Sequence, residues 1–162
     1  MKKPFQYASF IFEYLATIFL ASIMVIVVLQ VIFRYVIQIV VPWTEEMSRY
    51  LCIWMVFMGA TAAVAKKSHI CVTFVVDRAP EKLRYFFNLF SLLVVWIFNL
   101  IVFLGSIELV RLNWGQQAVT FPVSIGVLYL SITLSSFSIL VFLLIQIYLQ
   151  FKAHPFRTDI ER

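Results

Sequence analysis

The feature that most constrains this chain is the spacing of its charged residues, which leaves long stretches without any formal charge. Residues 14–33, 50–65, 85–107 and 112–151 form four such stretches, and apolar side chains dominate each of them. A helix needs about 20 residues to cross about 30 Å of hydrocarbon at about 1.5 Å per residue. Three stretches are long enough by themselves, and the second is long enough if its flanking residues join it. The pattern predicts an all-α integral membrane protein with four transmembrane helices.

Composition agrees with this fold class. The chain is 63% hydrophobic and 13% charged, whereas globular proteins average about 45–50% apolar and about 25% charged residues. We predict a single membrane domain over residues 1–162, with spans at roughly 12–36, 45–65, 82–108 and 124–151. No internal repeat is visible, and four helices are too few for the inverted-repeat core of a typical secondary transporter.

The basic residues predict the orientation of the chain. Ten of the 13 lysine and arginine residues lie in the N-terminus, the second connector and the C-terminal tail: Lys2, Lys3, Lys66, Lys67, Arg78, Lys82, Arg84, Lys152, Arg157 and Arg162. The positive-inside rule therefore places both termini in the cytoplasm and the first and third connectors outside. Trp43 and Trp114 fall in the outward connectors, where aromatic residues anchor at headgroup level. The net charge of +5 reflects this bias and does not indicate nucleic-acid binding.

The second connector has its own pattern. Residues 68–78 include the apolar Ile70, Val72 and Phe74, and the segment is too short to span a membrane. Such a segment is suited to lying at the membrane surface. One interpretation of the cytoplasmic connector is therefore a short interfacial helix.

The outward start of the second span gathers charged residues. Thr44 is predicted to cap the helix, with Glu45 and Glu46 in its first turn against the positive end of the helix dipole. Arg34 and Arg49 flank this group on either side. One interpretation is that Arg34 extends to lipid phosphate while both glutamates are solvated. The other is that Arg34 pairs with Glu45 or Glu46, in a polar cluster that fixes the first two helices or receives a partner.

The second span also carries small residues at helical spacing. Gly59 and Ala63 form a small-xxx-small pair, a pattern that lets another helix approach closely. The pair fits packing within the four-helix unit or a docking face for another protein.

Polar residues inside the spans are scattered. The amides are Gln30, Asn88, Asn99 and Gln146, and we expect them to form hydrogen bonds between helices. The hydroxyls of the fourth stretch belong to Ser131, Thr133, Ser135, Ser136 and Ser138. They can bond to carbonyls of their own helix or to a neighbouring helix, and the bond within the helix is favoured.

No catalytic or metal-binding pattern is apparent. His69 and His154 both flank cytoplasmic helix ends, so they cannot form the facing pair that a membrane di-haem protein needs. Cys52 and Cys71 match neither a redox pair nor a zinc site. No Asp or Glu lies in the centre of a span, which argues against a small proton-coupled exporter. We therefore predict no enzyme activity, no catalytic residue, no cofactor and no metal site.

Several motifs together resemble a known family. They are Phe33-Arg34-Tyr35, Pro42-Trp43-Thr44-Glu45-Glu46, Arg49, Gly59-Ala60, Lys66-Lys67-Ser68-His69-Ile70 and the segment from Asp77 to Pro80. In order and spacing they resemble the small membrane subunit, DctQ-like, of tripartite ATP-independent periplasmic (TRAP) transporters. The Trp-x-Glu-Glu entry to the second span, followed by the basic cluster and His69-Ile70, is the most specific element.

The resemblance implies an accessory subunit in a bacterial inner membrane. It would brace the large membrane subunit of a secondary transporter that imports an organic acid, with a periplasmic binding protein delivering the substrate. Sodium coupling would belong to the large subunit. The expected partners are the large subunit, the binding protein and membrane lipids. The suspected structural or partner-contact residues are Arg34, Trp43, Glu45, Glu46, Arg49, Gly59, Ala63 and His69. The alternatives are a self-sufficient small transporter and a membrane redox-anchor subunit.

Overall fold

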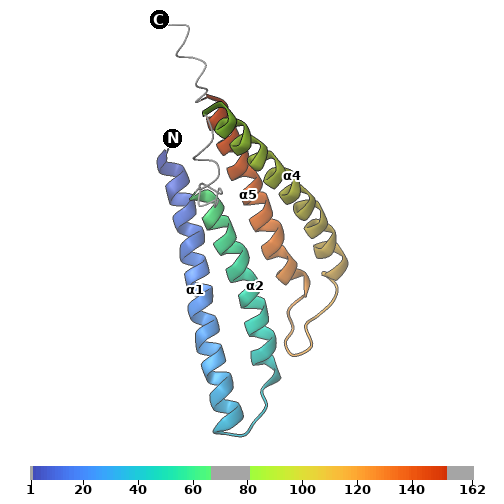
Figure 1. Cartoon of the computed structure of the whole chain (residues 1–162). Helices are drawn as coiled ribbons and strands as arrows, with labels where there is room; N and C mark the ends of the chain where they lie inside the picture. The colour runs from blue at the N-terminus through green and yellow to red at the C-terminus, as the bar shows by residue number, and fades with distance from the viewer. Residues whose placement is uncertain (1, 67–80, 153–162) are drawn as a thin grey trace, which may run out of the picture.

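The computed structural model describes residues 2–66 and 81–152, and this part of the chain consists of helices and two connectors (Figure 1). The helices are α1 (Lys2–Tyr35), α2 (Pro42–Ala65), α4 (Glu81–Asn113) and α5 (Gly126–Lys152). Each contains a stretch long and apolar enough to cross a membrane: Ser9–Tyr35, Pro42–Ala65, Phe86–Asn113 and Gly126–Gln150. The predicted all-α class with four spans is confirmed. The proposed interfacial helix and His69 lie outside the described residues.

The helices stand side by side in an open row (Figure 1). α1 packs against α2, α2 against α5, and α5 against α4, whereas α1 and α4 make no helix contact with each other. An edge-to-face contact of Phe12 with Phe142, 6.1 Å between ring centroids, adds a link from α1 to α5. α2 and α5 are therefore the central helices of the row, and α1 and α4 are its edges. Most of the apolar surface of the edge helices faces away from the protein, as a bilayer permits.

The start of α2 differs from the prediction, because Thr44 is not its cap. The helix begins at Pro42, after Val41 in an extended conformation. Proline lacks the N–H that a first helical residue leaves unpaired, and its φ is already helical. Thr44 instead lies inside the first turn, fully buried, and its Oγ1 donates to the carbonyl of Val41 over 2.7 Å. This hydrogen bond of the Thr44 hydroxyl thus stabilises the first turn of α2.

The seams between helices are lined by small residues. Among the residues whose side chains the structure describes, those 2% exposed or less are, apart from Leu143, Thr44, Thr61, Ser106, Ser131, Ser135 and Ser136. Small side chains let helix backbones come close, which is how helices associate where lipid is as apolar as leucine. Ala62 and Ala65 of α2 are buried in the same way. Large apolar residues therefore face mainly outward.

An amide side chain crosses each seam of the row. Between α4 and α5, Asn99 Nδ2 donates to the carbonyl of Ser136 over 2.9 Å. Between α5 and α2, Gln146 Nε2 donates to the carbonyl of Val64, also over 2.9 Å. Between α2 and α1, Gln30 Nε2 makes a longer bond of 3.4 Å to Glu45 Oε1. The predicted interhelical role is confirmed for these three amides.

The hydroxyls of α5 mostly bond within their own helix, as predicted. Ser131, Thr133 and Ser138 donate to the carbonyls of Leu128, Tyr129 and Leu134. Thr133 Oγ1 also lies 3.0 Å from Ser106 Oγ on α4 and adds a second polar contact to that seam.

The seam between α4 and α5 yields a stability prediction. Replacing Asn99 by Leu removes the donor to Ser136 and should lower the free energy of unfolding in detergent by about 1 kcal/mol, the size of hydrogen bonds between membrane helices. The measurement is thermal unfolding of the purified chain followed by circular dichroism. Asn113→Leu is the matched control, because Asn113 Nδ2 bonds only to Leu109 of its own helix. Equal losses of unfolding free energy in both variants would show that the bond between helices stabilises the protein no more than the bond within one helix.

Candidate functional site

The α4–α5 connector is a folded hairpin, here called the 114–125 hairpin. Gln117 and Ser124 form an antiparallel bridge, and the amide of Ala118 donates to the carbonyl of Val123 over 2.8 Å. Ser124 Oγ accepts from the amide of Gly126 at 3.0 Å and donates to the carbonyl of Trp114 at 2.7 Å. One hydroxyl thus caps the start of α5 and ties it to the end of α4.

Gly126 allows the start of α5 to lie close to Trp114, which follows the end of α4. A Cβ at this position would lie 2.9 Å from Trp114 Cε3 and 3.1 Å from the Cα atom of Trp114. The Trp114 ring would have to shift, and the Trp114 backbone would have to give by a few tenths of an ångström. The start of α5 can therefore lie this close to Trp114 because residue 126 has no side chain.

Glu46 holds the 114–125 hairpin on α2. Its Oε1 accepts from the amide of Val119 at 3.1 Å, and its Oε2 accepts from the amide of Thr120 at 2.8 Å and from the Thr120 hydroxyl. Hydrogen bonds to an ionised carboxylate are roughly twice as strong as neutral ones. One turn further along α2, the ring of Tyr50 packs on that of Phe121 with centroids 5.5 Å apart. A polar and an aromatic contact together fix the hairpin.

Glu45 and Glu46 contact different parts of the protein although they are neighbours in the sequence. Glu45 accepts from Gln30 on α1, whereas Glu46 accepts from the 114–125 hairpin. The first turn of α2 therefore joins α1 on one side and the α4–α5 pair on the other. Arg49 follows one turn later, is exposed, and attracts the carboxylate of Glu46 electrostatically.

Arg34 does not pair with either glutamate. The ion pairs among the described residues are Lys66 Nζ with Glu13 Oε2 at 2.6 Å and Arg111 with Glu108 at 4.0 Å. Antiparallel packing brings Gln30, one turn before Arg34, to Glu45 instead. Arg34 is exposed in the last turn of α1. There its charge is favourable next to the negative end of the helix dipole.

The other predicted site residues are dispersed. Trp43 and Trp114 are 44% and 56% exposed. Trp43 lies in the first turn of α2 and Trp114 follows the end of α4. The side of the helix row that carries the α1–α2 and α4–α5 connectors, toward the bottom of Figure 1, is here called the connector end. Gly59 has no other residue within 4 Å of where a Cβ would be, and Ala63 is exposed. This small-residue pair therefore lies on a face of α2 that no other described helix covers.

Sequence reasoning missed the partners of Glu46. The donors are two backbone amides and a threonine hydroxyl in a connector, and backbone donors carry no residue-specific signal. The available hint was the short segment bounded by Gly115 and Gly126 with Pro122 inside it, a composition typical of turns. It could predict a turn but not where the turn lies against α2.

The arrangement positions a surface. Among the described residues, no cluster of three or more His, Cys, Asp or Glu side chains could hold a metal ion. The polar groups of the connector end are instead bonded to one another across α1, α2 and the 114–125 hairpin. The connector end is therefore a partly polar face to which α1, α2 and the 114–125 hairpin all contribute.

The contacts of Glu46 yield a prediction about the hairpin. Glu46→Ala removes the acceptor of the Val119 and Thr120 amides, so amide hydrogen exchange in the 114–125 hairpin should accelerate at least about tenfold, given bonds to a charged group worth about 1.5–3 kcal/mol. The measurement is hydrogen exchange with mass spectrometry on the detergent-solubilised chain. Glu45→Ala is the control and should leave exchange in the hairpin unchanged. Unaltered exchange in Glu46→Ala would contradict this role.

Comparison with known proteins places the chain in a family. The family model for the DctQ component of tripartite ATP-independent periplasmic transporters matches residues 23–153. A putative TRAP transporter small permease protein of Haemophilus influenzae is 25% identical over 133 residues, which are 82% of this chain and 81% of that protein. The C4-dicarboxylate TRAP transporter small permease protein DctQ of Vibrio cholerae is 28% identical over 101 residues, 62% of this chain and 44% of that protein.

A third relative is much longer than this chain. The sialic acid TRAP transporter permease protein SiaT of Haemophilus influenzae is 29% identical over 92 residues, which are 57% of this chain but 15% of SiaT. The match to the family model covers well over half of the chain, from the middle of α1 to the end of α5. The chain therefore belongs to the DctQ component family of TRAP transporters, a family of small membrane permease subunits.

Proposed function

We propose that this chain braces the large membrane subunit of a TRAP-type secondary transporter in a bacterial inner membrane. The observation that carries the proposal is the open row of helices. Its seams are closed by small residues and amide bonds, so the four described helices enclose no interior through which a substrate could pass. Its edge helices instead present long apolar surfaces outward. A rigid body of this kind is suited to supporting another membrane protein.

The comparison with SiaT supports a large permease as the partner. In that relative a segment similar to this chain is contained in a much longer permease. The part of such a permease that has no counterpart in residues 1–162 is the partner that we propose for this chain. The open face of α2 around Gly59 and Ala63 is a candidate contact, because small residues admit a neighbouring helix closely.

Transport chemistry would belong to the partner. The relatives named above are named for C4-dicarboxylates and sialic acid, and both of these carry carboxylates. We therefore propose an organic acid as the cargo. Sodium coupling and substrate binding would lie in the large subunit, and this chain would hold no cofactor. Its contribution would be a fixed element against which the moving part of the permease works.

The proposed orientation has both termini in the cytoplasm and the connector end outside. The distribution of basic residues supports it through the positive-inside rule. Trp43 and Trp114 at the connector end are exposed, as interfacial anchors are. A periplasmic binding protein would then meet the first turn of α2 and the 114–125 hairpin.

The bracing role predicts that uptake requires this chain. Deleting it while retaining the large subunit should abolish binding-protein-dependent uptake of labelled organic acid into cells. The tagged chain, purified in mild detergent, should carry a large polytopic membrane protein in about equal amount. Unchanged uptake after deletion would contradict the role. Uptake by this chain alone would point to a self-sufficient transporter, and a haem or flavin absorption band would point to a redox anchor.

Docking of the binding protein predicts a charge effect at Glu45. Trp43, Glu45 and Arg49 are exposed at the connector end, whereas Glu46 is occupied by the hairpin. Glu45→Lys should lower uptake several-fold at limiting binding protein while the membrane complex stays intact, because rim charges act mainly on encounter. Glu108→Lys, which reverses an exposed glutamate on α4, should have little effect. Equal uptake in both variants would show that Glu45 takes no part in docking.

A further inference from the structure

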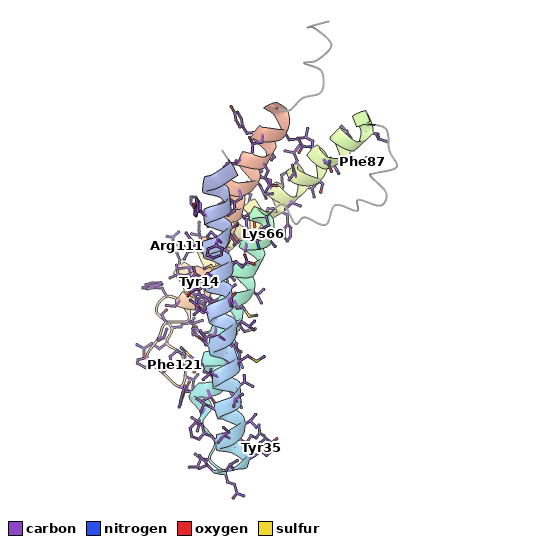
Figure 2. All side chains as sticks on the ribbon, turned by 90° about the vertical axis from the view of Figure 1, so that its left-hand side faces the viewer. Tyr14, Tyr35, Lys66, Phe87, Arg111 and Phe121 are labelled. Carbon is purple, nitrogen blue, oxygen red and sulfur yellow. The ribbon has the colours of Figure 1, made fainter. Side chains whose placement is uncertain are left out.

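The connector between α1 and α2, residues 36–41, is apolar and exposed. Val36 and Val40 are each 76% exposed, and Ile37 and Ile39 are exposed as well. No formally charged residue lies between Arg34 and Glu45. Figure 2 shows Tyr35, the last residue of α1, at the far end of the molecule. Apolar surface in water costs about 25 cal/mol per Å², so this connector is poorly suited to being a solvated loop.

Three of the six backbone amides of the connector and the carbonyl of Val41 are bonded within the protein. The amides of Val36 and Ile37 both donate to the carbonyl of Ile32, at 2.9 and 3.2 Å, and the amide of Ile39 donates to that of Phe33 at 3.0 Å. The carbonyl of Val41 accepts from the amide and hydroxyl of Thr44. Pro42 has no N–H to satisfy. The other backbone groups of residues 36–41 need partners such as water or lipid headgroups, which the interfacial layer supplies and the hydrocarbon core does not.

Gln38 makes the reversal between the two helices. Its φ is 60°, in the left-handed region, which a non-glycine residue adopts at a cost of about 1–2 kcal/mol. It is also the one polar side chain of residues 36–41. The connector thus turns tightly and keeps apolar side chains on both sides of the turn.

The length of α1 sets the depth of the connector. Glu13, paired with Lys66, marks one end of the charge-free part of the helix, and Arg34 marks the other. The intervening residues 14–33 span about 30 Å at about 1.5 Å per residue, the thickness of the hydrocarbon core. The connector beyond Arg34 therefore falls in the interfacial layer, which brings the whole bilayer to about 40–45 Å.

The flanking side chains fit a lipid surface. Arg34 is exposed and forms no ion pair with any described residue, so its guanidinium can reach a lipid phosphate. Tyr35 and Trp43 stand on either side of the connector and are 73% and 44% exposed. Aromatic rings of this kind are enriched at the headgroup level of membranes. In contrast, the 114–125 hairpin gives amides of its tip to Glu46 and is held by protein.

We propose that residues 36–41 insert into the headgroup and acyl-chain boundary of the leaflet at the connector end, with Arg34 bound to lipid phosphate. The ligand is a phospholipid surface. This anchor would fix the depth and tilt of the α1–α2 pair independently of any protein partner. It goes beyond the bracing role and does not depend on it.

The test measures the surroundings of the connector directly. A cysteine-free full chain, made by Cys52→Ser and Cys71→Ser, receives Val36→Cys or Val40→Cys and a nitroxide label. It is reconstituted without partners, at low protein-to-lipid ratio, into vesicles of phosphatidylethanolamine and phosphatidylglycerol. Collision rates of the label with oxygen, which concentrates in lipid, and with a water-soluble nickel chelate are measured by electron paramagnetic resonance. Val28→Cys, at an exposed position in the charge-free part of α1, is the hydrocarbon reference.

Insertion predicts that both connector labels collide more often with oxygen than with the nickel chelate, with a ratio below that of the Val28 reference. A nickel rate above the oxygen rate would overturn the proposal and show a solvated loop. Low rates with both reagents would also overturn it, because they would show a label covered by protein. Since no transport partner is present, either failure leaves the bracing role untouched.

Discussion

The structure depends on satisfying polar groups where water is absent. Inside a bilayer, helices gain little from burying apolar side chains against one another, since lipid is equally apolar. Asn99 and Gln146 provide a directional alternative, because each donates to a carbonyl of the neighbouring helix. Around them the seams are filled by serine, threonine and alanine. The row is therefore specified by a few polar contacts and by close backbone approach, rather than by a large apolar core.

Polar contacts between separate parts of the chain also hold the connector end together, and they come from the first turn of α2. Two adjacent carboxylates are used for separate tasks, Glu45 toward α1 and Glu46 toward the 114–125 hairpin. Tyr50 adds an aromatic contact with Phe121 one turn further on. A single helical turn thus determines how the α1–α2 pair and the α4–α5 pair meet. The polar surface that would face a binding protein is built on this turn, so its geometry follows from the packing of the membrane helices.

Much of the fold could be predicted from the sequence because the bilayer imposes a simple length rule on uncharged stretches. The interhelical role of the amides could be predicted for the same reason, since an amide in hydrocarbon needs a partner. The order of the helices in the row could not, because periodicity does not identify which apolar face meets which helix. The partner of Glu46 could not be predicted either, since it is mainly backbone amide. Of the two interpretations of Arg34, its pairing with Glu45 or Glu46 is not the one observed, because the register between the antiparallel helices brings Gln30 to Glu45.

The order of the row has a consequence for how the protein is made. α5, the last helix synthesised among those described, lies between α2 and α4. Domains emerge from the ribosome N-terminus first, so α1 and α2 can pair early as one helical hairpin. α4 has no place beside α2 until α5 arrives, and the α4–α5 pair then joins as a second unit. The Gln146 bond to Val64 would close the seam between the two units at the end of biogenesis. Until that contact forms, the faces of α2 and α5 that meet in the folded protein are open to other helices.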